Sequence, residues 1–159
     1  MDRLDRKILC LLQEDATFSV ADIAKKVGLS TTPCWRRIQK LEEDGVIQRR
    51  VAILSPQKVN VHVTVFVSIR VNSHSHEWFK RFSKIIHEFR EVIEFYRMNG
   101  DIDYLLRVVV PNIESYDIFY KKLTTQIDIY DVSSSFAMEQ IKYTTELPLD
   151  YIILEKENR

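Results

Sequence analysis

The sequence has little of what fixes many small folds, since only two of its 159 residues are cysteine, three are glycine and four are proline. Cys10 and Cys34 both lie in the first quarter, with no CxxC spacing and no histidine nearby. This pattern argues against a disulfide framework and against a zinc site. We therefore expect each thiol to be reduced and buried or half-buried.

Long apolar runs are also absent. No stretch approaches the roughly 20 apolar residues that a membrane span requires, and the first 15 residues, MDRLDRKILCLLQED, carry charges throughout instead of a signal peptide's apolar segment. Because 45% of the residues are hydrophobic, the chain can build a packed core, as one domain or two small ones. The sequence predicts a cytoplasmic protein with no membrane partner.

The formal net charge is zero, which by itself gives no support for nucleic-acid binding. The distribution is more informative: residues 1–50 sum to +2 and residues 51–159 to −2. Residues 30–41 contain Arg36, Arg37 and Lys40 and no acidic residue. A local basic face of this kind is compatible with DNA binding, above all when an oligomer presents several copies.

Apolar spacing predicts three helices in the first 50 residues. The first covers residues 2–14, and the second begins after Ser19 and ends at Gly28, which can adopt the left-handed conformation that ends a helix. The third is capped by Ser30 and ends at Gly45. An extended stretch then runs through Leu54.

The second and third of these helices have the pattern of a helix-turn-helix. Ala24 allows close helix approach, Gly28 makes the turn, and Cys34 and Ile38 face inward at about 100° per residue. The opposite face of the third helix carries hydrogen-bond donors suited to phosphates and base edges, and Arg37 lies at the edge of this face. The alternative is an ordinary three-helix bundle whose third helix is merely solvated. The predicted DNA-binding residues are Thr31, Thr32, Trp35, Arg36, Arg37, Gln39 and Lys40.

The rest of the chain changes to a mixed pattern. Residues 61–71 alternate with period two, as a half-buried strand does. A helix, a hairpin of two strands around Asn99-Gly100-Asp101, another helix and a last strand over 132–144 follow. This is the α+β order of a ferredoxin-like βαββαβ domain, joined to the helices by a linker at residues 55–58. Two helices cover only one face of such a sheet, so we expect a dimer to cover the other.

Five segments together resemble the Lrp/AsnC (feast/famine) regulators: LDRKIL, IAKKVGLS, TPCWRRIQKLEEDGVI, GDIDYLLRVVV and SSSFAMEQIKYTTELPL. The resemblance covers about residues 2–150. It implies a winged helix-turn-helix over 1–50, a hinge strand and linker over 51–59, with the strand near 48–55, and a ligand-binding and oligomerisation domain over 60–159. It further implies dimers that assemble into octamers, amino acids as effectors, and double-stranded DNA as partner. The string CWRR is similar to members that regulate amino-acid catabolism.

The resemblance also implies an effector site between dimers. Backbone N–H groups near Gly100 would hold a carboxylate, Asp103 an ammonium, and Tyr104 would form a wall. Asn99 departs from the family, which usually has Thr or Ser there. The alternative is a well-made turn with Tyr104 as an ordinary strand aromatic. The predicted effector residues are Gly100, Asp101, Asp103 and Tyr104, with Ser133, Ser134 and Ser135 of a neighbouring chain.

Other classes of function find less support. His74 and His76 lack the further ligands a metal site needs, so we read them as a solvated loop without metal or cofactor. Some ferredoxin-like domains are acylphosphatases, but that chemistry requires an arginine in a phosphate-binding loop, and residues 72–74 contain none. We therefore predict that the protein is not an enzyme. An architectural DNA-wrapping protein that ignores small molecules remains the alternative to an effector-responsive regulator.

Overall fold

The computed structural model describes residues 1–72 and 75–154, so His74 and the last five residues of the expected C-terminal domain lie outside the described part. The chain forms two compact units. The head unit contains residues 1–52 together with the chain from Lys142 onward, and the sheet unit contains residues 53–141.

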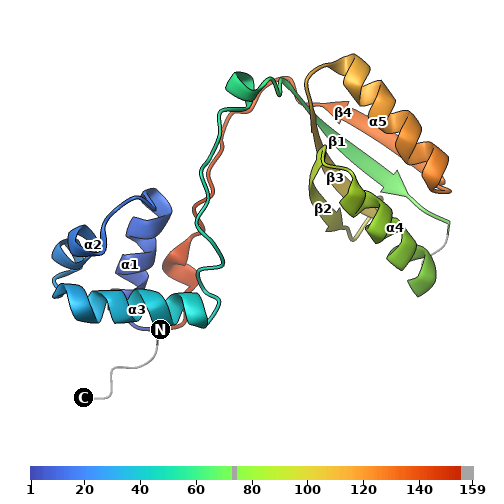
Figure 1. Cartoon of the computed structure of the whole chain (residues 1–159). Coiled ribbons are helices and arrows are strands. Elements are labelled where there is room, and N and C mark those ends of the chain that lie inside the picture. Colours follow the sequence, from blue (N-terminus) through green and yellow to red (C-terminus); the bar gives the residue numbers. More distant parts are fainter. Residues whose placement is uncertain (73–74, 155–159) are drawn as a thin grey trace. The chain divides into compact units, whose positions relative to one another are not determined.

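Three helices form the head unit (Figure 1): α1 (Arg3–Glu14), α2 (Val20–Val27) and α3 (Thr31–Glu43). They confirm the three predicted helices, and Gly28 has the expected left-handed conformation at φ 76°. Ser30 occupies the N-cap position of α3, but its hydroxyl accepts no hydrogen bond from the described first turn. The reason is Pro33, which lacks the N–H that a cap residue would bind three positions later.

The head core consists of side chains from all three helices, and the helix-turn-helix packing is as predicted, with Cys34 and Ile38 buried. Cys10, by contrast, is exposed, which corrects the expectation that each thiol is buried or half-buried. It follows Leu9 on α1 and so points about 100° away from the side chain that enters the core. The buried residues are Ile8, Leu9, Ile23, Ala24, Val27, Cys34, Ile38 and Leu41.

The end of the chain also belongs to the head. Leu149 and Ile152 pack on the head core. The Gln13 amide donates to the carbonyl of Leu147 at 3.2 Å and accepts from the Leu147 N–H at 2.8 Å. Arg6 pairs with Asp150. Apolar burial and these polar contacts therefore place residues 142–154 with α1, although the expected boundary left them in the domain 60–159.

No strand forms at residues 48–55, in contrast to the hinge strand that the resemblance implied. The backbone there hydrogen-bonds no neighbouring strand of the described chain, and a strand needs such a partner. Ile53 and Leu54 are exposed. The linker predicted at residues 55–58 is a short 3-10 helix, Pro56–Val59.

The sheet unit has the order β1 (Val63–Arg70), α4 (His76–Glu88), β2 (Val92–Arg97), β3 (Tyr104–Val110), α5 (Ile113–Gln126) and β4 (Asp131–Phe136). The strands form one sheet in the order β2-β3-β1-β4, with all neighbours antiparallel. This confirms the ferredoxin-like arrangement. The last strand is shorter than the predicted 132–144 because β1, its neighbour in the described sheet, begins at Val63. The final contact is Ala137 N–H to the Thr64 carbonyl at 2.9 Å.

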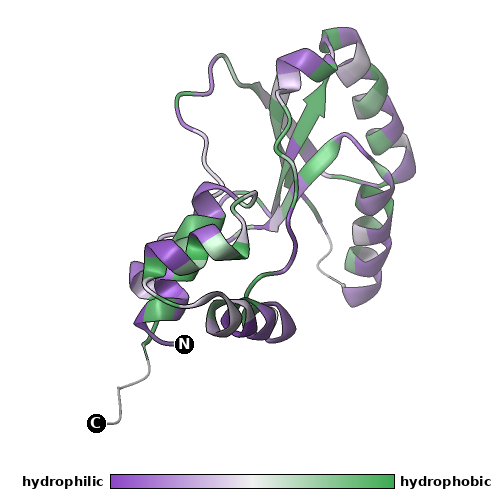
Figure 2. Cartoon of the chain, turned by 60° about the vertical axis from the view of Figure 1, so that its left-hand side comes forward, coloured by the Kyte–Doolittle hydropathy of each residue, from purple (hydrophilic) through white to green (hydrophobic). Residues whose placement is uncertain are grey.

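Helices α4 and α5 cover one face of the sheet (Figure 1). The predicted alternation along β1 is confirmed, since Val65, Val67 and Ile69 are fully buried against the helices. In Figure 2 the two helices carry hydrophilic stretches between hydrophobic ones, as amphipathic helices on a sheet do. The opposite face, here called the open face, exposes Phe66 and Tyr96.

Candidate nucleic-acid interface and ligand site

The outer face of α3 presents polar, basic and aromatic groups. Its inner residues hold it on α1 and α2, and the glycine turn after α2 fixes where it begins. Trp35 is 49% exposed, which leaves a large apolar surface in water that a partner would cover. The predicted residues that are exposed are Thr31, Thr32, Trp35, Arg36 and Lys40.

Arg37 is placed differently. Its guanidinium donates to Asp2 at 2.6 Å and to Asp5 at 2.7 Å, and these carboxylates also form the capping box of α1. Burial alone would raise the pKa of Asp2, but hydrogen bonds from the Asp5 N–H and from Arg37 outweigh it, so the pKa lies below 3.8. Arg37 therefore fastens α3 to α1.

Gln39 is also engaged within the head. Its amide donates to Glu42 at 3.0 Å, and Glu42 in turn pairs with Arg50 at 2.8 Å. The seven residues predicted to bind DNA thus divide into five exposed ones and two that are partly buried and already hydrogen-bonded. Helical angle alone put Arg37 at the flank of the exposed face, but it could not show the two carboxylates of α1 that meet it.

The loop between β2 and β3 is fixed to the end of β1. The Asp103 carboxylate accepts the Val71 N–H at 2.8 Å, and the Asp101 carbonyl accepts from Arg70 at 2.6 Å. Gly100 has φ 130°, which L side chains rarely adopt. These contacts give Asp103 a positioning role in the loop, whereas the contact of Asp101 uses only its backbone.

Tyr104 is 3% exposed and lies in the core on the helix side of the sheet. Its ring neighbours Trp78, Phe82 and Phe95, and burial raises its pKa. In this chain the ring therefore packs as an ordinary core aromatic and does not form a pocket wall. This burial could have been predicted from the sequence, because Tyr104 and the buried Leu106 are two positions apart on β3 and therefore point to the same face of the sheet.

The three serines of β4 lie on two faces. Ser133 pairs in register with Ser68 and Ser135 with Phe66, and both serines are exposed. Ser134 points the other way and shares a hydrogen bond with the Tyr116 hydroxyl of α5. The sheet therefore brings Ser133 and Ser135, but not Ser134, onto the open face.

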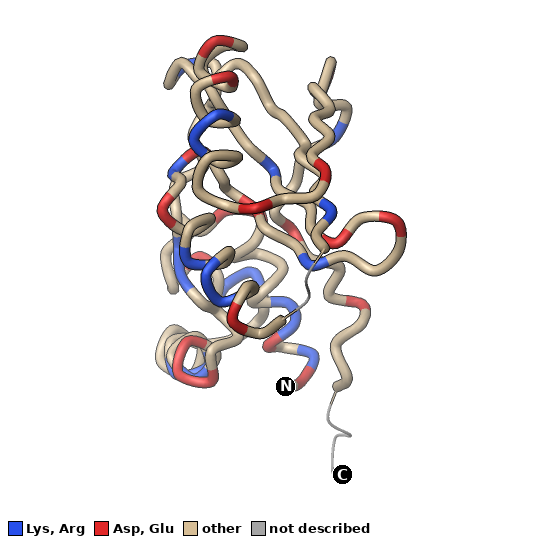
Figure 3. Tube along the Cα trace, turned by 90° about the vertical axis from the view of Figure 1, so that its right-hand side faces the viewer, with Lys and Arg blue, Asp and Glu red and all other residues tan. Residues whose placement is uncertain are grey.

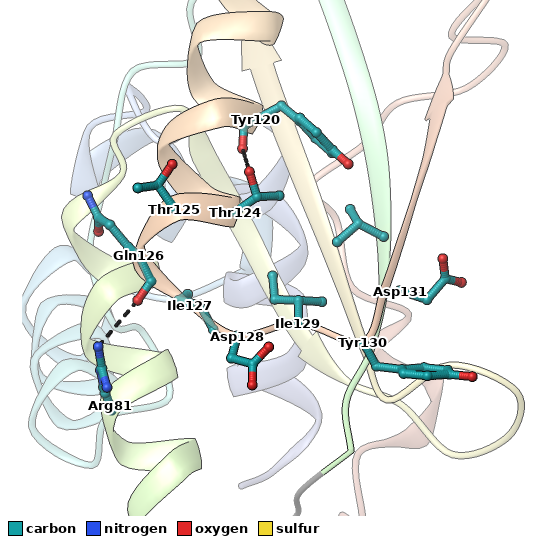
Figure 4. Close-up of a pocket in the computed structure, with 11 residues that line it drawn as sticks. Arg81, Tyr120, Thr124, Thr125, Gln126, Ile127, Asp128, Ile129, Tyr130 and Asp131 are labelled. Atoms are coloured by element: carbon teal, nitrogen blue, oxygen red, sulfur yellow. Dashed lines mark hydrogen bonds between the residues drawn. The ribbon is translucent and has the colours of Figure 1, made fainter.

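An open pocket of about 570 Å³ lies where α5 ends and the chain enters β4 (Figure 4). Arg81 of α4 lies on one side of the pocket and Tyr130 on the opposite side, with Asp128 of the connecting segment between them. Asp131 pairs in register with Arg70, the residue that binds the Asp101 carbonyl. The pocket and the predicted effector loop thus occupy the same end of the sheet. No sequence motif marked this pocket.

The described residues contain no group of three or more His, Cys, Asp or Glu side chains placed to hold a metal ion. None of their helices is long and apolar enough to cross a membrane.

Comparison with known proteins gives two family matches. Residues 1–48 match the winged helix-turn-helix DNA-binding family, and residues 64–147 match the Lrp/AsnC ligand binding domain. The DNA-binding transcriptional activator DecR of Escherichia coli is 49% identical over 94% of this chain and 99% of its own. The glutamate uptake regulatory protein of Zymomonas mobilis is 52% identical over 94% of this chain and 91% of its own.

Solved structures agree. An AsnC family regulator from Agrobacterium tumefaciens is 74% identical, with a TM-score of 0.94 over 96% of this chain and 100% of its own. A Neisseria meningitidis regulator in complex with L-Met is 30% identical, with a TM-score of 0.91 over 96% of this chain and 99% of its own. The chain belongs to the Lrp/AsnC family, whose members are transcription regulators and not enzymes, and it joins a helix-turn-helix that binds DNA to a ligand-binding domain.

Proposed function

We propose that the protein is an amino-acid-responsive regulator whose α3 reads the major groove of DNA. The observation that carries the DNA-binding part is the outer face of α3, where Arg36 and Lys40 are exposed beside Trp35. Arg36 is suited to a base edge and Lys40 to a phosphate. As a regulator of chromosomal genes, the protein would act in the cytoplasm.

The functional unit we propose is a dimer joined through the open face, which assembles further into an octamer. Arg107 lies on the open face, pairs with Glu94 at 2.8 Å, and has a buried Nε with no partner among the described residues. A second chain on this face would further exclude water from the Arg107–Glu94 pair and so strengthen it. Exposed Phe66 and Tyr96 on the same face would add apolar burial. A C2 dimer would place two copies of α3 about 34–36 Å apart on DNA.

Light scattering at micromolar concentration tests this assembly. A mass of at least two chains is expected, and Arg107→Ala should shift the equilibrium toward the monomer. A monomeric wild type would contradict the proposal.

The proposed effector is an amino acid, bound at the end of the sheet where the Gly100–Tyr104 loop, Arg70 and the pocket at the end of α5 meet. Relatives support this choice: one is a leucine-responsive regulatory protein that is 34% identical, and the Neisseria structure contains L-Met. Because Asp103 accepts the Val71 N–H, its replacement by alanine would disturb the loop as well as the charge. Asp103→Asn keeps an accepting oxygen and removes only the charge.

The decisive experiment titrates operator DNA and the common amino acids together, following DNA affinity by fluorescence anisotropy. We expect an amino acid to change wild-type affinity by roughly 5–150-fold, the usual range of allosteric coupling. Asp103→Asn should reduce that response and leave basal DNA binding unchanged. An equal response would exclude Asp103 as the ammonium partner, and no response to any amino acid would favour the architectural protein.

A further inference from the structure

A hollow on the head unit gathers basic side chains away from the exposed face of α3. Arg3, Arg6 and Lys7 come from the first half of α1 and Lys26 from the last turn of α2, around a volume of about 760 Å³. Figure 3 shows Lys and Arg positions of the head helices close to the N-terminus. No acidic residue is among the described residues that line this hollow.

The hollow has an apolar floor beneath these charges. Leu11 of α1, the buried Val27 of α2 and Leu154 of the C-terminal segment line it. Leu154 is present because the preceding residues, through Leu149 and Ile152, pack on the head core. A concave site with an apolar floor and a few converging charged groups has the character of a small-molecule site.

The charges are only partly compensated. Arg6 pairs with Asp150, and Lys26 lies 4.5 Å from the centre of the Phe18 ring. Arg3 and Lys7 are both exposed, and Arg6 is half-buried. Four cations around one hollow repel each other, and an anion placed among them would be attracted by all four.

We propose that this hollow binds an organic anion with an apolar body, such as an aromatic or aliphatic sulfonate, carboxylate or phosphate. The anionic group lies among Arg3, Lys7 and Lys26, and the apolar body covers Leu11 and Leu154. The site is separate from the ligand site of the sheet unit. A bound ligand would also hold the C-terminal segment on the head, because Leu154 forms part of the floor.

Cys10 gives a local readout, since it lines the hollow and is exposed, whereas Cys34 is buried. Iodoacetamide should therefore alkylate Cys10 in the native protein, as measured by mass spectrometry of the peptide. The probe ligand is 8-anilino-1-naphthalenesulfonate. At a concentration ten times its Kd, alkylation should slow by roughly tenfold, because only the unoccupied fraction reacts.

The charge dependence tests the assignment. Lys7→Glu and Lys26→Glu should each raise the probe concentration needed for protection by about three- to tenfold. Lys25→Glu is the matched control, because Lys25 neighbours Lys26 on α2 but does not line the hollow. Inorganic phosphate, which has charge but no apolar body, should protect weakly. Absence of protection by the probe, equal effects of all three substitutions, or equal protection by phosphate would each overturn the proposal.

Discussion

Two adjacent arginines on α3 should behave in opposite ways when each is replaced by alanine. Arg37 joins α3 to the capping box of α1 through two charged hydrogen bonds, of 2.6 Å to Asp2 and 2.7 Å to Asp5. Arg36 is exposed. We therefore expect Arg37→Ala to lower the stability of the head and Arg36→Ala to weaken DNA binding.

The magnitude follows from the exposure of the partners. The Arg37 side chain is 32% exposed, that of Asp2 35% and that of Asp5 15%. Exposed ion pairs contribute about 0.2–1 kcal/mol each, and buried hydrogen bonds to charged groups about 1.5–3 kcal/mol. Because solvent partly screens both contacts, we expect Arg37→Ala to lower the unfolding free energy by about 1–2 kcal/mol in total. For a unit of this size each kcal/mol corresponds to a fall in Tm of about 4–8 °C.

The pH dependence gives a second measurement. Because the pKa of Asp2 is lowered on folding, its contribution is complete above the ordinary value of 3.8 and is lost as the pH falls through the lower, folded value. The difference in Tm between wild type and Arg37→Ala should therefore be constant near neutral pH and shrink below about pH 4.

Calorimetry and operator binding on both variants complete the test. Arg36→Ala should keep the wild-type Tm and lose roughly 1–3 kcal/mol of specific binding if it contacts a base. An unchanged Tm for Arg37→Ala, together with weakened binding, would show that Arg37 serves DNA and not the head, and would refute the reasoning.

Three further substitutions test the fold around the sites. Leu106→Ala removes a fully buried side chain from the sheet core and should lower the unfolding free energy by about 2–5 kcal/mol in urea titrations. Leu149→Ala should weaken the packing of the C-terminal segment, seen as faster hydrogen exchange at the Leu147 N–H that Gln13 holds. At Gly100 an added Cβ would meet no atom within 4 Å, but valine there would have to adopt φ 130°. The strain of about 1–3 kcal/mol should lower the Tm of Gly100→Val, and an unchanged Tm would show that the loop relaxes.

Much of the fold could be predicted from the sequence because its signals are local. The alternation of Val65, Val67 and Ile69 depends only on the two-residue repeat of a strand, and the structure buries all three. The end of α2 at Gly28 was predictable because it depends only on the left-handed backbone conformation of that one residue. The order of strands and helices then restricts the possible sheets to very few.

The roles of individual polar residues were harder to predict because they depend on contacts distant in sequence. Arg37 meets carboxylates more than 30 positions away, and periodicity gives no information about such partners. The same holds for Asp103, whose acceptor role was set by the Val71 N–H across the sheet. Tyr104 and Ser134 are different, since strand parity alone would have placed both on the helix side.

The place of residues 142–154 in the head unit was also hard to predict from the sequence. A flexible loop of roughly 90 residues between two parts of one core would cost about 4 kcal/mol to close. Here the insertion is itself folded, and its β4 end is held beside the start of β1 by the Ala137–Thr64 hydrogen bond of 2.9 Å. The sheet unit therefore keeps the two chain connections close together and removes most of that entropic cost. The contacts of Gln13 and Leu149 are then enough to attach residues 147–152 to the head, although they follow the complete sheet in the sequence.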